Sequence, residues 1–205
     1  SMLLDTDSEV VVRFGGDRRD VELLQGRVQF DVHHDPARPF SVRAEGGTVT
    51  DVGTVFQIRL DDDAVNVALL QGEVAIATRT HGQSRSASLK AGEQLRYDRD
   101  GEIGPVQPID TLAAEGWTHG KLFVHDWSLP QLLAAMNRYN DTKLEIGDPA
   151  LDDVRISGAF KVGDQQTLLQ ILREGWSIDA RRTSPTRIVL SQRTTGTAPT
   201  HSSSR

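Results

Sequence analysis

The chain has 205 residues, of which 37% are hydrophobic and 25% are charged, a composition that excludes a fibrous or disordered protein. Its net charge of -6 and the lack of a basic stripe argue against nucleic acid or an anionic membrane surface as the main partner. Cysteine is absent, which excludes a disulfide framework, a thiolate nucleophile and a cysteine-bound metal.

Short stretches of alternating apolar residues run through about the first hundred residues. The clearest are residues 28–32, 56–60, 65–69 and 74–76, where every second side chain is apolar. This period of two is typical of half-buried strands, and the Gly- and Asp-rich clusters between them are typical of turns. We therefore predict an all-β domain over residues 1–110, with a layered or sandwich-like architecture.

The pattern V-x-L-L-Q-G-x-V occurs twice in this region, at residues 21–28 and at residues 67–74. In each copy a strand ends at a glycine, which can adopt a turn or bulge conformation, and a second strand follows. A shorter relative at residues 89–95 places another glycine between two apolar positions. The repetition predicts stacked β layers.

The character of the sequence changes between Asp98 and Trp117, where Gly and Pro residues break regular structure. We place the domain boundary after residue 110 and predict a second domain over residues 111–191. From residue 192 to residue 205 the chain consists mainly of Thr, Ser, Gly and Pro, and this tail is predicted to be disordered.

The second domain alternates strands and helices. The predicted strands are residues 122–124, 144–146, 154–160, 177–180 and 187–190. The predicted helices span residues 130–140 and about 164–175, and each has apolar residues at helical spacing with a capping side chain at its start. The element order, βαβ followed by βαββ, predicts a small α/β domain.

The sequence carries few signs of catalysis or metal binding. It lacks the P-loop, the G-x-S-x-G nucleophile elbow and the H-E-x-x-H zinc motif, so we predict that the chain is not an enzyme and needs no cofactor. Residues 33–35 are His-His-Asp, but neighbours on a strand point to opposite faces. His119 and His125 lack a third ligand, and the acidic residues 61–63 lack the spacing of a calcium loop, so a solvated turn is expected there.

Two motifs in the first domain are specific. Residues 30–40 have the pattern F-D-V-x-H-D-P-x-R-P-F, and residues 52–56 have the pattern V-G-T-x-F. The tetrapeptide Q-G-E-V at residues 71–74 and A-G-E at residues 91–93 follow in that order. Together they closely resemble the FecR domain.

The second domain resembles the short N-terminal (STN) domain that secretins and TonB-dependent transducers share. The likeness is carried by Trp117, by N-R-Y at residues 137–139 and by I-S-G-A-F at residues 156–160. The two resemblances together cover nearly all of residues 9–191.

The resemblance implies the periplasmic signalling region of a FecR-type regulator, an inner-membrane protein with a single membrane pass. In this family an outer-membrane TonB-dependent transducer that has bound a ferric siderophore presents its signalling domain to this region. Site-specific proteases then cleave the regulator, and an extracytoplasmic-function (ECF) sigma factor is released from its cytoplasmic segment. No apolar run here approaches the roughly 20 residues that span a bilayer. Regulators of this type carry a membrane helix before this region, so the resemblance implies a membrane anchor upstream.

A small α/β domain has sheet edges with unpaired backbone groups, which an added partner strand can satisfy. We expect residues 117–191 to bind the transducer's signalling domain through one of two strands and the helix beside it. The expected contact residues are Leu144, Glu145 and Ile146 on one strand, and Val154, Arg155, Ile156 and Ser157 on the other.

Two other functions are compatible with the sequence. Secretin-like α/β domains also serve as oligomerisation units, so an envelope-assembly module is the main alternative. A β-helical, polysaccharide-active enzyme would explain the strand repeats, but it needs a pair of carboxylates in a cleft, and no pairing in the sequence identifies one.

Overall fold

The structure, a computed structural model, describes residues 1–51, 53–80 and 82–193. It divides into two compact units, Ser1–Gly120 and Lys121–Arg205, called here the first and second units. The tail predicted to be disordered begins at Gln192, which is the last residue of a strand, and Arg193 is also described. The rest of that predicted tail lies outside the described residues.

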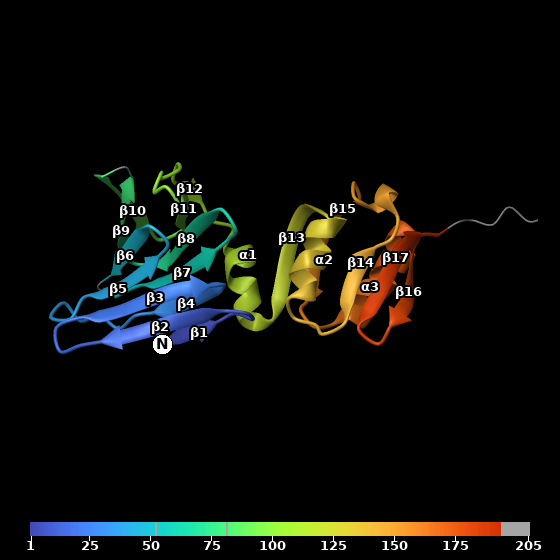
Figure 1. Ribbon diagram of the computed structural model, residues 1–205, viewed down its shortest axis with the longest axis horizontal. Helices are drawn as coiled ribbons and strands as arrows, with labels where there is room; N and C mark the ends of the chain where they lie inside the picture. Colours follow the sequence, from blue (N-terminus) through green and yellow to red (C-terminus); the bar gives the residue numbers. More distant parts are fainter. Residues whose placement is uncertain (52, 81, 194–205) are drawn as a thin grey trace, which may run out of the picture. The chain divides into compact units, whose positions relative to one another are not determined.

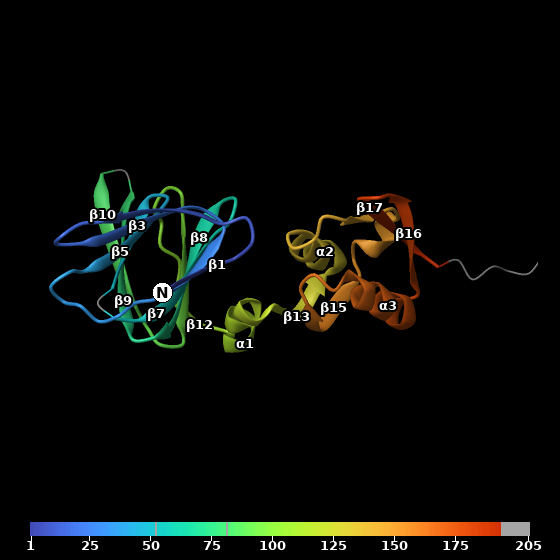
Figure 2. The ribbon, with the colours of Figure 1, turned by 90° about the horizontal axis from the view of Figure 1, so that it is seen from below.

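Two six-stranded sheets make up most of the first unit, and Figure 2 shows them as facing layers. One sheet has the order β1 (Met2–Leu4), β4 (Arg27–Asp31), β7 (Val55–Leu60), β8 (Ala64–Gln71), β11 (Glu93–Asp98) and β12 (Gln107–Pro108). The other has the order β10 (Gln83–Lys90), β9 (Glu73–Thr80), β6 (Gly47–Asp51), β5 (Phe40–Ala44), β3 (Arg19–Gln25) and β2 (Glu9–Phe14). The layered, all-β architecture agrees with the expectation from the sequence.

The inner faces of these two sheets enclose one hydrophobic core. In β4, for example, Val28 and Phe30 are fully buried while Asp31 is exposed, as a period of two requires. The ring of Phe30 stacks on Phe56 with centroids 5.0 Å apart and lies 5.5 Å from Phe40. Burying a side chain of this size contributes about 1.5–3 kcal/mol.

Glycines form the corners where the chain crosses from one sheet to the other. Gly26, Gly72 and Gly92 follow β3, β8 and β10, with φ angles of 85°, 90° and 87°. Glycine adopts this left-handed region without the steric cost that other residues meet. At Gly26 an added Cβ would also lie 2.3 Å from the Ser8 hydroxyl. Gly26 and Gly72 are the glycines of the V-x-L-L-Q-G-x-V pattern, so the repeat encodes two equivalent corners.

Helix α1 (Thr111–Gly116) and the 3-10 helix η1 (Trp117–His119) belong to the first unit, whereas the sequence placed them in the second domain. Trp117 is 6% exposed, and its indole N–H donates to the Gln57 side-chain oxygen at 3.1 Å. Gln57 in turn donates to the Ala114 carbonyl at 2.8 Å, and the Arg27 guanidinium lies 4.4 Å from the Trp117 ring centroid. Trp117 and Gln57 are 60 residues apart, so local sequence breaks could not place this boundary.

The second unit contains two small sheets and two helices (Figure 1). Its elements are β13 (Lys121–Ser128), α2 (Leu129–Asn137), β14 (Lys143–Ile146), the 3-10 helix η2 (Pro149–Leu151), β15 (Arg155–Lys161), α3 (Gln165–Trp176), β16 (Ile178–Ser184) and β17 (Arg187–Gln192). One sheet pairs β13 with β15, and the other has the order β14, β17, β16. The order of strands and helices is the one predicted, and a second hydrophobic core fills this unit.

Both helices of the second unit begin at a capping side chain, Ser128 for α2 and Asp164 for α3. The Ser128 side chain accepts a hydrogen bond from the Gln131 N–H, and the Gln131 side chain bonds back to the Ser128 N–H, which forms a capping box. The Asp164 carboxylate accepts from the N–H of Thr167 at 3.1 Å. Among the described residues, neither these helices nor any other is long and apolar enough to cross a membrane.

Candidate partner-binding site

The acidic cluster at residues 61–63 lies in the turn between β7 and β8, and its described contacts are internal. Asp61 accepts hydrogen bonds from Arg59 at 2.9 Å and from Asn66 at 2.6 Å. Asp63 pairs with Arg96 at 2.7 Å. These carboxylates are engaged by cationic and amide side chains of the protein itself.

Across the three described ranges, no group of three His, Cys, Asp or Glu side chains is arranged to hold a metal ion. His33 and His34 lie in the loop that joins β4 to β5. Their neighbour Asp35 accepts a hydrogen bond from Arg38 at 2.9 Å, which lowers the pKa of that carboxyl below its usual value. His125 is exposed on β13.

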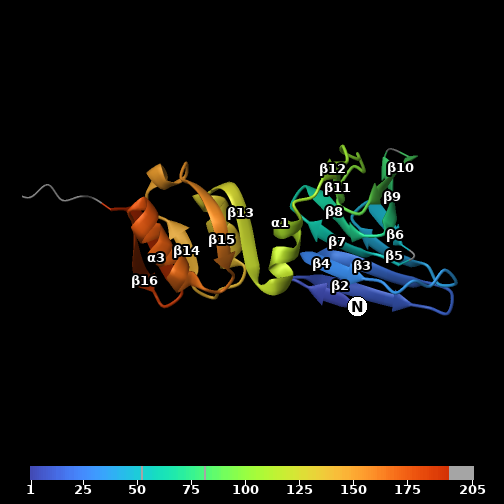
Figure 3. The same cartoon turned by 180° about the vertical axis from the view of Figure 1, so that it is seen from behind.

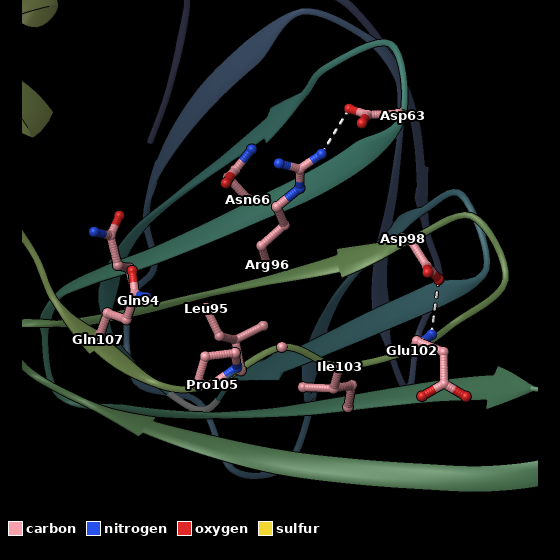
Figure 4. Close-up of a pocket in the computed structure, with 11 residues that line it drawn as sticks. Asp63, Asn66, Gln94, Leu95, Arg96, Asp98, Glu102, Ile103, Pro105 and Gln107 are labelled. Atoms are coloured by element: carbon pink, nitrogen blue, oxygen red, sulfur yellow. Dashed lines mark hydrogen bonds and ion pairs between the residues drawn. The ribbon is translucent and has the colours of Figure 1, made fainter.

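An open groove of about 760 Å³ lies beside β8 and β11 in the first unit (Figure 4). Two of the carboxylates that line it form ion pairs: Asp63 pairs with Arg96, and Glu102 pairs with Arg85 at 2.9 Å. Asp98 accepts the backbone N–H of Glu102 at 2.8 Å. Sugar cleavage needs one carboxyl group that donates a proton and a second that acts on the opposite face. The lining of this groove offers no such unengaged pair.

The sheet edges of the second unit are the remaining candidates for a site. Each of β13, β14, β15 and β16 has a single strand partner within the described part of the chain. A strand of this kind presents unpaired backbone N–H and C=O groups along its other side. The four edges differ in how the protein protects them.

The edge of β14 is blocked by a side chain. The Lys143 N–H donates to the Thr186 carbonyl just before β17, and the Gly147 N–H donates to the Leu190 carbonyl in β17. The N–H and C=O of Leu144 therefore point toward the open side. There the Asn137 side chain accepts from the Leu144 N–H at 2.8 Å and donates to the Leu144 carbonyl at 2.8 Å. Asn137 thus occupies the position that a partner strand would need.

The edge of β13 is interrupted by a bulge. His125 and Asp126 together face the single residue Ser157 on β15, and Asp126 has a φ angle of 54°. The Asp126 N–H donates to the Ser157 hydroxyl at 2.9 Å, and Arg155 donates to the Asp126 carbonyl at 3.3 Å. The extra residue lies on β13 and none lies on β15. Figure 3 shows the two strands side by side.

The structure places six of the seven predicted contact residues in two different sheets. Leu144, Glu145 and Ile146 lie on β14, and Arg155, Ile156 and Ser157 lie on β15, so the two sets do not share one edge. Val154 lies just before β15, where its carbonyl accepts the Leu129 N–H at 2.8 Å. All seven remain predictions as contact residues.

Burial further divides these residues. Leu144 and Ile156 are 2% and 0% exposed and belong to the core. Glu145 is engaged by Arg187 on the neighbouring strand. The outward-facing side chains of β15 are therefore better placed for a partner than those of β14.

Sequence analysis missed Asn137, the residue that separates the two edges. It lies at the end of α2, where a polar residue is ordinary, and its role depends on the position of β14 seven residues later. The N-R-Y motif at residues 137–139 includes it, but the motif does not indicate that its side chain bonds to Leu144.

Comparisons with known proteins find one family model that matches part of the chain and two solved structures with a similar fold. A sequence model described as FecR protein matches residues 1–75. Two crystal structures of a candidate anti-sigma factor from Parabacteroides distasonis are 21% identical to this chain. One has a TM-score of 0.74 and covers 94% of this chain and 90% of that one; the other has a TM-score of 0.69 and covers 94% and 99%. Identity at this level shows the fold alone, and a comparison with curated proteins gives no match.

Proposed function

We propose that the chain belongs to the FecR family, whose model matches residues 1–75, and that it is the periplasmic signalling region of an anti-sigma regulator. The second unit, whose sequence resembles an STN domain, binds the signalling domain of a TonB-dependent outer-membrane transducer. Binding relays siderophore availability to an ECF sigma factor held by the regulator's cytoplasmic segment, and site-specific proteases act between the two events. The fold shared with a candidate anti-sigma factor supports the regulatory part of this proposal.

The open edge of β15 is the observation that carries the binding part. This strand pairs only with β13 within the described ranges, and Ser157, Gly158 and Ala159 at its centre are all exposed. A partner strand added there would satisfy the free backbone groups, and contacts with alternate side chains would select the partner. A stable interface needs about 800 Å² from each protein, so the neighbouring surface must also take part.

Isothermal titration calorimetry of the full chain against signalling domains of several TonB-dependent transducers tests this function. Saturable binding with one-to-one stoichiometry to at least one domain is expected. If every domain fails to bind, the relay is wrong for this chain. Light scattering on the same sample then examines the assembly alternative, which requires rings or filaments of the chain.

Amide hydrogen exchange of the full chain, with and without the bound domain, locates the contact. We expect slower exchange at β15 and at the elements beside it in the second unit. Slower exchange confined to the first unit would show that a transducer binds elsewhere and would overturn the assignment of recognition to the second unit.

A further inference from the structure

The second unit protects three of its four open strand edges. Asn137 occupies the edge of β14, and the bulge at Asp126 distorts β13. On β16 the register shifts between Arg182 and Ser184, which interrupts the regular ladder of that strand. Among the described residues of this unit, β15 alone has an open edge without an extra residue or a blocking side chain, and its centre has small residues, with Gly158 at a φ angle of 157°.

The outward face of β15 is basic at both ends. Arg155 and Lys161 are exposed and lie on the same face as Ser157 and Ala159, because residues two apart share a face. Lys161 lies directly opposite Lys121 on β13, and like charges in this position repel each other. Lys161 also acts on the Asp164 carboxylate, whose pKa its charge lowers.

A second copy of the chain does not fit this edge. If two β15 strands paired antiparallel about Gly158, each Arg155 would lie opposite a Lys161 of the other copy. Two such like-charge pairs would oppose the backbone hydrogen bonds. The charge pattern therefore selects a partner of opposite sign.

We propose that β15 pairs with an acidic strand from the partner protein. That strand carries a carboxylate opposite Arg155 and another opposite Lys161, about 20 Å apart at about 3.3 Å per residue. Between them, a large apolar side chain covers Ala159 and the half-buried Phe123 opposite it. This inference rests on the proposed function, with the partner strand belonging to the transducer's signalling domain.

The test uses a signalling domain that binds the unmodified full chain in the calorimetric titration above. Lys161→Glu should weaken its binding about tenfold or more, because a like-charge contact replaces an attractive one. Arg155→Glu should have an effect in the same direction. Replacing the facing carboxylate of the partner with lysine should restore binding to the Lys161→Glu chain.

Arg181→Glu is the matched control, since it makes the same change of charge on an exposed strand of the other sheet. It should change affinity by less than about twofold, and circular dichroism should show that all three variants are folded. If the domain binds the Lys161→Glu and Arg155→Glu chains as tightly as the unmodified chain, the acidic-strand inference is overturned while the relay stands. If no domain binds the unmodified chain, the proposed function itself fails.

Discussion

Tyr97 and Gly47 form one of the closest contacts in the core of the first unit. The Tyr97 side chain is fully buried, and its hydroxyl donates to the Ala44 carbonyl at 2.9 Å. Burial raises the pKa of this phenol far above its usual value, so the group stays a neutral donor. The ring lies so close to Gly47 that an added Cβ would come within 2.5 Å of it.

Gly47→Ala should therefore destabilise the first unit by about 1–3 kcal/mol, because the ring and the strand must move apart. Urea denaturation followed by circular dichroism measures the change. Gly16→Ala is the control, since no atom lies within 4 Å of the position its Cβ would take. Its effect should be within about 0.5 kcal/mol. Equal effects of the two substitutions would show that the Tyr97 contact is looser than described.

At the scale of elements, Asn137 ties the end of α2 to the edge of β14. Asn137→Ala removes both hydrogen bonds to Leu144 and leaves a partly buried N–H and C=O without these partners. The expected loss is about 1–3 kcal/mol in the free energy of unfolding of the second unit. Urea titration with tryptophan fluorescence measures it, since Trp127 and Trp176 both lie in this unit.

Asn140→Ala provides the comparison for that experiment. The Asn140 side chain donates a hydrogen bond of 2.8 Å to the Met136 carbonyl at the end of the same helix, but it does not reach β14. Asn140→Ala should lower the free energy of unfolding of the second unit by less than Asn137→Ala does. The reverse ranking would mean that the helix end, and not the strand edge, supplies the stability.

The cap of α3 gives a prediction for pH. The Thr167 backbone N–H and then its hydroxyl bond to Asp164, which lowers the pKa of this carboxyl below its ordinary value of 3.8. A lowered pKa in the folded state means that the carboxylate stabilises α3 above its ordinary pKa and loses this effect as pH falls through the folded value.

Asp164→Asn keeps a capping side chain but removes the titrating group. The unmodified chain should be the more stable of the two at pH 7, and its advantage should shrink toward pH 3. Urea denaturation of both chains at the two pH values checks this. A difference in stability that stays constant with pH would contradict the role assigned to the Asp164 charge.

Much of the fold could be predicted from local sequence patterns, because the alternation of apolar residues and the glycines at turns determine the conformation of segments only a few residues long. The two glycine corners at Gly26 and Gly72 and the strand and helix order after residue 121 follow from such signals. The assignment of α1 to the first unit does not follow from local signals, because it depends on the contact of Trp117 with Gln57, which is distant in the sequence. Likewise, the assignment of β14 and β15 to separate sheets depends on pairing that no single segment encodes.

At the scale of the whole molecule, each unit has a core of its own. The two hydrophobic clusters share no residue, and Phe56 and Leu132 are fully buried members of the first and second clusters. Phe56→Ala should lower the free energy of unfolding of the first unit by about 3–5 kcal/mol, and Leu132→Ala should lower that of the second unit by about 2–5 kcal/mol. In each case the substitution leaves a cavity.

Because the cores are separate, each substitution should act within its own unit. Native-state hydrogen exchange of the full chain should show faster exchange in the first unit for Phe56→Ala and in the second unit for Leu132→Ala. Faster exchange in both units after either substitution would mean that they unfold as one cooperative body. Separate unfolding would let a partner bound at β15 change the stability of the second unit without disrupting the core of the first.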